Sequence, residues 1–418
     1  MTGLSCVACG REYSPDGPWV ACPECGPNDG IVDIHFDLDA VRHAWREHPL
    51  KDRPLNHWRY RELLPLEPAS IPRHWSVGWT PLIETPRLAR SLGLRQLLFK
   101  DEGRNPTASF KDRASSVGVA HAMEHHARVI ACASTGNAAT SLAGHAALAG
   151  LACVIFVPDT APEPKLAQLL VYGAHVVAVR GSYDQAYQLC SEACAKFGWY
   201  NRNCAINPVL VEGKKTGGLE IAEQTDALGG MPDWVAVSVG DGCTIAGVWK
   251  GLKHMHDLGI IDRLPRLLGV QAEGVAPIAH LIEHGNLPDP SQTTGTIADS
   301  INVPVPRNWR KAVKALTESD GVVVCVDDAH ILDAMKLAGR HGVFAEPAAA
   351  AALAGVVSAR EYDLLSADDR VLCMVTGSGL KDTRAAIKAG GQPIRIPPDL
   401  DSLASALSGR GVLDGADA

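Results

Sequence analysis

Short apolar runs alternating with longer helical stretches constrain the fold of this chain more than any other feature. Seven runs share a nearly continuous apolar and β-branched sequence, at residues 128–133, 152–158, 175–180, 234–239, 266–274, 321–326 and 371–376. Strands of parallel sheets that helices cover on both faces have this composition. The pattern predicts an α/β fold, and 418 residues are enough for two sheet units.

The composition argues against several classes of function. The formal net charge is −8 and no cluster of lysine and arginine occurs, so we expect no nucleic-acid partner. Glycine or polar residues interrupt the apolar runs, so we expect no membrane span. The N-terminus lacks a basic segment followed by an apolar one, which argues against secretion. A cytoplasmic enzyme is the expectation.

Four cysteines near the N-terminus have the spacing C-x2-C-x12-C-x2-C: Cys6, Cys9, Cys22 and Cys25. Each CxxC pair can direct two thiolates at one metal ion, and four thiolates suit tetrahedral Zn. A redox pair is the alternative, but two matched pairs in so short a segment argue against it. Because four thiolates leave no open coordination position, we expect a structural zinc ribbon.

Three polar or glycine-rich loops follow predicted strands: 134–137 (STGN), 240–244 (GDGCT) and 376–379 (TGSG). In open parallel sheets, ligands bind beyond the carboxyl ends of the strands, so the loops are expected to meet at one ligand. The loop 240–244 opens a predicted helix, where backbone N–H groups favour a phosphate. It matches neither the dinucleotide nor the ATP motif. Asp241 would repel a phosphate, so we expect it to point away and cap the helix.

The motifs SFKDR with Lys111, STGN, the glycine loop, EPA at 346–348 and TGSGLKD at 376–382 occur in an order that resembles one enzyme family. The chain is similar, over roughly residues 75–390, to the fold type II pyridoxal-phosphate (PLP) enzymes and within them to threonine synthase. The resemblance implies two parallel-sheet, three-layer domains. Some members of the family also carry an N-terminal zinc ribbon.

The resemblance implies a role for each matching residue. Lys111 would hold the cofactor as a Schiff base and move the substrate Cα proton, and an apolar setting would lower its pKa. Phe110 would lie against the pyridine ring, Asn137 would bond the ring oxygen, and Thr376 would meet the ring nitrogen. The cofactor phosphate would bind Gly240, Asp241, Gly242, Cys243 and Thr244.

The loop 134–137, which follows the predicted strand at 128–133, would bind the substrate. Its members Ser134, Thr135, Gly136 and Asn137 would meet the substrate carboxylate, with Ala138 and Leu210 near the side-chain end. The family has polar residues where this chain has Ala138, Cys204, Ala205 and Leu210. One lost charge-assisted hydrogen bond costs about 1.5–3 kcal/mol. The pocket is therefore expected to be more apolar, with Lys214 or Lys100 offsetting part of the loss.

We therefore expect a threonine-synthase-like lyase that catalyses elimination or β-replacement on a small amino acid of the serine or threonine type, and not on O-phosphohomoserine. Three alternatives remain open: a true threonine synthase, an amino-acid racemase or epimerase, and a non-enzymatic zinc-ribbon binding protein. Enzymes of this fold are commonly dimers, so a homodimer is the expected assembly.

The motifs suggest a division of the chain into five parts. Residues 1–30 form the ribbon and 31–75 an extension with a helix at 41–45. A smaller domain at 76–210 would carry Lys111 and Asn137. A larger domain at 211–395 would carry the phosphate loop and Thr376, and 396–418 would form a frayed tail.

Overall fold

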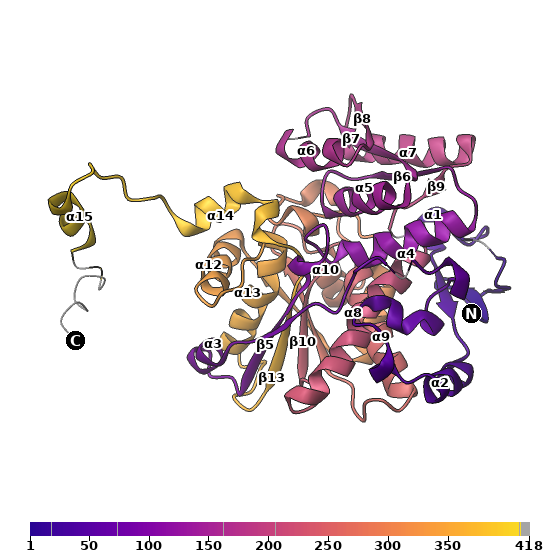
Figure 1. Cartoon of the computed structure of the whole chain (residues 1–418), viewed down its shortest axis with the longest axis horizontal. Coiled ribbons are helices and arrows are strands. Elements are labelled where there is room, and N and C mark those ends of the chain that lie inside the picture. Colours follow the sequence, from indigo (N-terminus) through magenta and orange to yellow (C-terminus); the bar gives the residue numbers. More distant parts are fainter. Residues whose placement is uncertain (18, 73, 162, 205, 409, 411–418) are drawn as a thin grey trace.

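The computed structural model describes residues 1–17, 19–72, 74–161, 163–204, 206–408 and 410, and it contains three sheets (Figure 1). The largest has the strand order β12-β11-β10-β13-β5-β4, and its pairs are parallel except that between β4 and β5. In chain order its strands are β4 (Leu82–Glu84), β5 (Gln96–Asp101), β10 (Trp234–Ser238), β11 (Arg266–Ala272), β12 (Val322–Val326) and β13 (Arg370–Val375).

A second, fully parallel sheet has the order β8-β7-β6-β9 and lies at the top of Figure 1. Its strands are β6 (Val129–Ala133), β7 (Ala152–Pro158), β8 (His175–Val179) and β9 (Tyr200–Asn201). A small antiparallel sheet near the N-terminus has the order β2-β1-β3, formed by β1 (Gly3–Cys6), β2 (Glu12–Tyr13) and β3 (Val32–His35).

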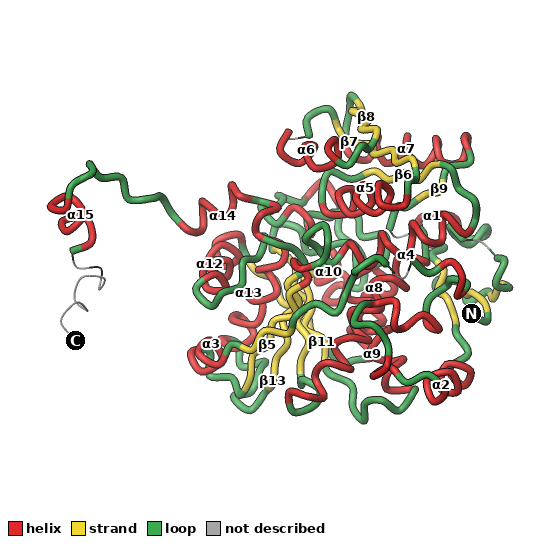
Figure 2. The backbone as a smooth tube through the Cα atoms, in the orientation of Figure 1, coloured by secondary structure: helices red, strands yellow, loops and turns green. Residues whose placement is uncertain are grey.

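Helices cover both faces of the large sheet, as Figure 2 shows. One core contains Leu97 and Phe99 of β5, while Leu98 between them belongs to the core on the other face. The first core is completed by helices α3 (Pro86–Ser91), α12 (Asp328–Gly339) and α13 (Pro347–Glu361), and the second by α8 (Val209–Thr225), α9 (Cys243–Asp257) and α11 (Trp309–Glu318). Because side chains alternate between two buried faces, most positions of these strands are apolar.

The smaller sheet has the same three-layer organisation. Ile130 and Cys132 of β6 share a core with α4 (Lys111–Glu124), α5 (Asn137–Ala149) and α6 (Glu163–Val171). Ala131 and Ala133 pack on the opposite face against α7 (Tyr183–Phe197). The predicted α/β class with two parallel three-layer units is therefore confirmed. The remaining helices are α1 (Gly26–Asp29), α2 (Leu38–Glu47), α10 (Pro277–His284), α14 (Thr383–Gly390) and α15 (Leu400–Leu407).

All seven predicted strands are present, but β4, β5 and β9 of the two larger sheets and the three strands of the small N-terminal sheet were not anticipated. Residues 82–101 pair with the large sheet, although the sequence-based division assigns them to the smaller domain at 76–210. The domain division otherwise stays a prediction. In the segment expected to be frayed, α15 stands away from the body in Figure 1, and residues 409 and 411–418 lie outside the described part. No helix of the described residues is long and apolar enough to cross a membrane.

A buried ion cluster ties α4 to α8 and to the large sheet. The Arg113 guanidinium donates to both carboxylate oxygens of Glu220, at 2.7 and 2.6 Å, and to both oxygens of Glu102 at 2.8 Å. The Lys100 Nζ donates to Glu220 at 3.0 Å, and the Trp79 backbone N–H does so at 2.7 Å. All four charged side chains are fully buried. Burial alone would raise the pKa of Glu220, but Arg113 and Lys100 hold it well below its usual range.

We predict that Glu220→Ala destabilises the protein by about 3–5 kcal/mol, because it leaves buried positive charge without its partner. Urea unfolding followed by fluorescence would measure the change. Glu47 is exposed, so Glu47→Ala serves as the control and should stay within about 0.5 kcal/mol of the wild type. Equal stabilities for the two variants would contradict the role of the cluster.

Candidate active site

A cavity of about 710 Å³ lies at the carboxyl ends of strands from both parallel sheets. Its lining includes twelve of the fourteen residues that the sequence predicts for cofactor and substrate, namely Lys111, Ser134, Thr135, Gly136, Asn137, Ala138, Gly240, Asp241, Gly242, Cys243, Thr244 and Thr376. The predicted convergence of the three loops is therefore present in the fold. Phe110 and Leu210 are not among the lining residues.

Lys111 is the first residue of α4 and points into this cavity. The preceding loop is held to the segment after β13, because the Phe110 N–H donates to the Thr376 carbonyl at 2.8 Å. Burial, followed by the nearby positive charge of Lys214, lowers the pKa of Lys111 to about 8. The neutral amine that can attack a carbonyl carbon is therefore accessible close to neutral pH.

The structure corrects the position expected for Phe110. Its ring packs against α8, where a Cβ added to Gly217 would lie 2.8 Å from the ring. The guanidinium of Arg113 lies 5.8 Å from the ring centroid. Phe110 therefore helps to fix the start of α4 from the buried side, and its ring is absent from the lining of the cavity.

The loop 240–244 forms an open helix N-terminus on the cavity. Gly242 precedes α9 with a φ of +87°, and no side chain caps this helix. A Cβ on Gly242 would lie 2.8 Å from the Cβ of Ala312, so a larger residue would not fit without a shift. The buried Ser238 Oγ nearby has no hydrogen-bond partner among the described residues. Free N–H groups and an unpaired hydroxyl make this end of the cavity suited to a phosphate.

Asp241 does not cap α9, contrary to expectation. Its carboxylate accepts hydrogen bonds from the Arg307 backbone N–H at 2.7 Å and from the Cys243 thiol at 3.5 Å. Burial, followed by the negative charge of Cys204, raises the pKa of Asp241 to about 6. Near neutral pH the carboxyl is therefore easier to protonate than an ordinary aspartate, which reduces its repulsion of a bound phosphate.

Asn137, the first residue of α5, contacts a carboxylate from the other sheet unit. Its Nδ2 donates to the Glu346 Oε1 at 2.8 Å, and Glu346 is the residue before α13. Burial raises the pKa of Glu346, while Asn137 and Lys111 oppose the rise. Glu346, whose role the sequence leaves open, thus orients the Asn137 amide at the cavity wall.

Two buried cations line the cavity: Arg202, which sequence reasoning missed, and Lys214, which it raised as a replacement cation. The Lys214 ammonium donates to the sulfur of Cys204. A hydrogen bond from Cys243, together with the charge of Lys214, holds the pKa of Cys204 well below its usual value despite burial. No sequence signal separates a buried arginine such as Arg202 from the exposed majority.

The residues expected to make the pocket apolar behave differently from one another. Ala138 lines the cavity, but Leu210 packs on α4, where a Cβ added to Gly118 would lie 2.7 Å from its methyl group. Lys100 is also absent from the cavity, since it is bound within the ion cluster described above. Ala205 lies outside the described residues.

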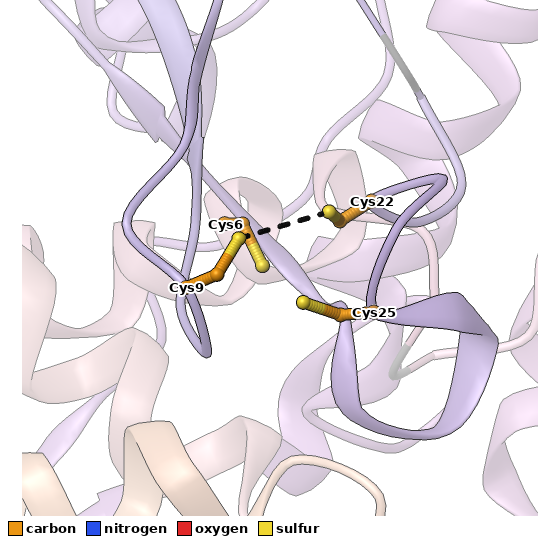
Figure 3. A group of neighbouring side chains, drawn as sticks. All are labelled: Cys6, Cys9, Cys22 and Cys25. Carbon is orange, nitrogen blue, oxygen red and sulfur yellow. Dashed lines mark hydrogen bonds between the residues drawn. The ribbon is translucent and has the colours of Figure 1, made fainter.

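The four N-terminal cysteines converge as their spacing predicts, and Figure 3 shows their thiols directed toward one another from two loops. Their sulfur atoms all lie within 4.8 Å of one another. Gly10 and Gly26, just after the two CxxC pairs, have φ values of +73° and +72°. Such angles are easily adopted by glycine and allow the tight turn of a zinc knuckle. The cluster therefore fits a zinc ribbon.

We predict that Cys204 reacts with a small alkylating reagent at an unusually low pH, since the thiolate is the reactive form. Lys214→Met should raise the midpoint of the pH profile by about 1–3 units by removing a neighbouring opposite charge. Peptide mass spectrometry after timed iodoacetamide treatment measures this. Lys253→Met, on the outer part of α9, is the control and should leave the profile unchanged. A wild-type midpoint near the usual thiol pKa of about 8.5 would contradict the prediction.

Residues 76–377 match the family described as pyridoxal-phosphate dependent enzymes. The chain is 38% identical to the threonine synthase of Methanocaldococcus jannaschii over 95% of this chain and 97% of that protein. It is 37% identical to the threonine synthase of Methanosarcina acetivorans over 98% of this chain and all of that protein.

Solved structures give the same fold. A threonine deaminase of Solanum lycopersicum superposes with a TM-score of 0.65 at 23% identity, over 74% of this chain and 86% of that one. A maize serine racemase superposes with a TM-score of 0.63 at 23% identity, over 74% and 91% of the two chains. With its buried lysine, its open helix N-terminus and these relatives, the chain belongs to the fold type II pyridoxal-phosphate dependent enzymes and, within them, to the threonine synthase family.

Proposed function

We propose that this enzyme catalyses PLP-dependent elimination or β-replacement on a small amino acid that carries its leaving group on Cβ. The observation that carries the proposal is the presence of Lys111 and the open N-terminus of α9 in one cavity. A lysine whose lowered pKa gives a substantial neutral fraction near physiological pH and a phosphate-binding helix end are the two anchors that PLP requires.

The residues of the cavity fit this cofactor. Lys111 would hold its aldehyde carbon, the loop 240–244 and the unpaired Ser238 hydroxyl would hold its phosphate, and Asn137 would meet its ring oxygen. Thr376 would meet the ring nitrogen with a hydroxyl rather than a carboxylate. When bound, PLP withdraws electrons from the substrate Cα, and a hydroxyl partner makes it a weaker electron sink, which favours elimination over transamination.

The side chains of this protein would supply the remaining steps. The loop 134–137 at the start of α5 offers backbone N–H groups and hydroxyls to the substrate carboxylate. Lys111, with its pKa lowered to about 8, would accept the Cα proton before the leaving group departs from Cβ. In a β-replacement it would return this proton to Cα after the incoming nucleophile has bonded to Cβ. Ala138, beside this loop, provides no hydroxyl for a more distant phosphate.

True threonine synthase activity on O-phosphohomoserine is the second candidate. The names of the relatives favour it, and so do the two cations Arg202 and Lys214 in the cavity. Against it, Lys214 is already bonded to Cys204, and Leu210, at the position where the family has an arginine, packs away from the cavity.

Purified enzyme loaded with PLP should act on serine, threonine or O-phosphoserine with a kcat/KM at least about 100-fold above that for O-phosphohomoserine, corresponding to the loss of about two charge-assisted hydrogen bonds. Keto acid, phosphate and threonine are the products to assay, and Lys111→Ala should abolish turnover of all substrates. Rapid conversion of O-phosphohomoserine to threonine and phosphate would contradict the proposed substrate.

We further propose that Cys6, Cys9, Cys22 and Cys25 hold one structural zinc ion, with the convergence of their sulfur atoms as support. Metal analysis should give about one zinc per chain, and Cys22→Ser should reduce it and lower the melting temperature, because a structural zinc site contributes folding energy. Cys325→Ser, in β12, is the control and should retain the zinc. Full zinc content in Cys22→Ser would contradict the assignment.

A homodimer in the cytoplasm remains our proposal for assembly and location.

A further inference from the structure

Arg202 is a buried guanidinium at the wall of the cavity. It follows β9, its side chain lines the cavity, and only 1% of its surface is exposed. Its backbone N–H donates to the Ala131 carbonyl of β6 at 2.8 Å, which fixes it beside the strand that leads to the loop 134–137. The residue therefore lies next to the expected position of the substrate.

The hydrogen bonds of Arg202 orient its side chain without neutralising it. Its Nε and Nη2 donate to the Ser115 Oγ at 3.2 and 2.8 Å, and Ser115 is itself 2.6 Å from the Ser141 Oγ. In the part of the chain that the structure describes, no carboxylate lies within ion-pair distance of Arg202. The Nη1 group and the second proton of Nη2 remain for another acceptor.

Arg307 and Lys214, two other cations of the cavity, already have partners. Arg307 lies 3.6 Å from the Asp184 carboxylate and 4.1 Å from the Tyr187 ring centroid. Lys214 is bonded to Cys204. Arg202 shares the negative charge of Cys204 with Lys214, since both lower the pKa of that thiol. Its Nη1 group has no acceptor among the described residues, and an anion of the bound ligand would supply one.

Two anionic groups of a PLP–substrate complex have other places to bind. The cofactor phosphate fits the N-terminus of α9, on the large sheet, and the substrate α-carboxylate fits the N-terminus of α5. Neither requires Arg202. A third anion on the substrate would meet the free edge of the guanidinium, which matches the two oxygens of a phosphate or carboxylate.

We propose that Arg202 binds an anionic group on the substrate side chain, so that the enzyme selects amino acids carrying a side-chain phosphate or carboxylate. This inference rests on the proposed function and specifies its substrate. In the family pattern the arginine stands at position 210, where this chain has leucine; Arg202 supplies the guanidinium from a different position, at the end of β9.

The test is a spectral titration of the PLP-loaded enzyme, which measures the Kd of each amino acid from its effect on the cofactor absorption band. The ligands are alanine, serine, aspartate, O-phosphoserine and O-phosphohomoserine. Wild type should bind at least one anionic ligand about tenfold or more tightly than alanine, the effect of one charge-assisted hydrogen bond. Arg202→Met should remove this preference and change the Kd of alanine less than about threefold.

Two variants separate binding from loss of folding. Ser115→Ala keeps the charge of Arg202 but removes the hydrogen bonds that orient it, so it should give an intermediate loss of preference while retaining the absorption band. Arg307→Met removes a cavity guanidinium that is already paired, and the preference should persist. Loss of preference in Arg307→Met, but not in Arg202→Met, would overturn the proposal.

The remaining outcomes identify the anion or reject the site. A preference for O-phosphoserine over aspartate indicates a phosphate, and the reverse indicates a carboxylate; either supports the role of Arg202 if Arg202→Met removes it. Arg202-dependent preference for O-phosphohomoserine supports the anion site while contradicting the shorter substrate proposed above. Equal Kd values for alanine and every anionic ligand, or equal weakening of alanine in Arg202→Met, would overturn the proposal. Absence of any PLP absorption band would instead reject the proposed function.

Discussion

The pairing of Arg113 with Glu220 and Glu102 is the interaction on which the geometry of the active site depends. Arg113 stands two residues after Lys111 on the same helix, and its partners come from α8 and from the segment after β5. A buried ion pair with several hydrogen bonds tolerates little displacement, because separating the charges exposes each to an apolar surrounding. The start of α4 is thereby held against the large sheet, and Lys111 is fixed between the two sheet units.

The N-terminal ribbon is attached to the same framework. Asp33 of β3 accepts from Lys250 of α9 at 2.8 Å and from Lys311 of α11 at 3.1 Å. Lys250 also bonds Glu212 of α8, so one chain of ion pairs joins the ribbon to the helix whose N-terminus faces the cavity. The N-terminal sheet is therefore tied by ion pairs to α9 and α11, which accords with a structural role for the ribbon.

The sequence predicts most of the fold, because seven strands are apolar on both faces and the loops after them carry recognisable motifs. It misses β5, whose sequence QLLFKD ends in the charged residues Lys100 and Asp101 and therefore lacks the continuous apolar run of the predicted strands. The predicted positions of Phe110 and Leu210 at the cavity were also wrong. Sequence spacing alone does not determine whether a side chain at the start of a helix faces the cavity or a neighbouring helix. Arg202 and Glu220 are buried only because distant segments supply their partners, so local sequence does not indicate their roles.

The cavity changes the expectation about the substrate. The apolar residues at positions where the family has polar ones suggest an apolar pocket. Arg202, which follows β9, nevertheless brings a buried charge to the cavity. Under the proposed function, the change of substrate would relocate an anion contact as well as delete it. The identity of the cofactor, by contrast, depends on Lys111 and the N-terminus of α9, which are positioned by the fold itself.

The most direct test of this account is the location of the cofactor on the chain. Reduction of the PLP-loaded enzyme with borohydride, followed by peptide mapping, should place a single pyridoxyl group on Lys111. Modification of Lys214, the other lysine of the cavity, or an even distribution over surface lysines would contradict the assignment of Lys111 as the cofactor anchor.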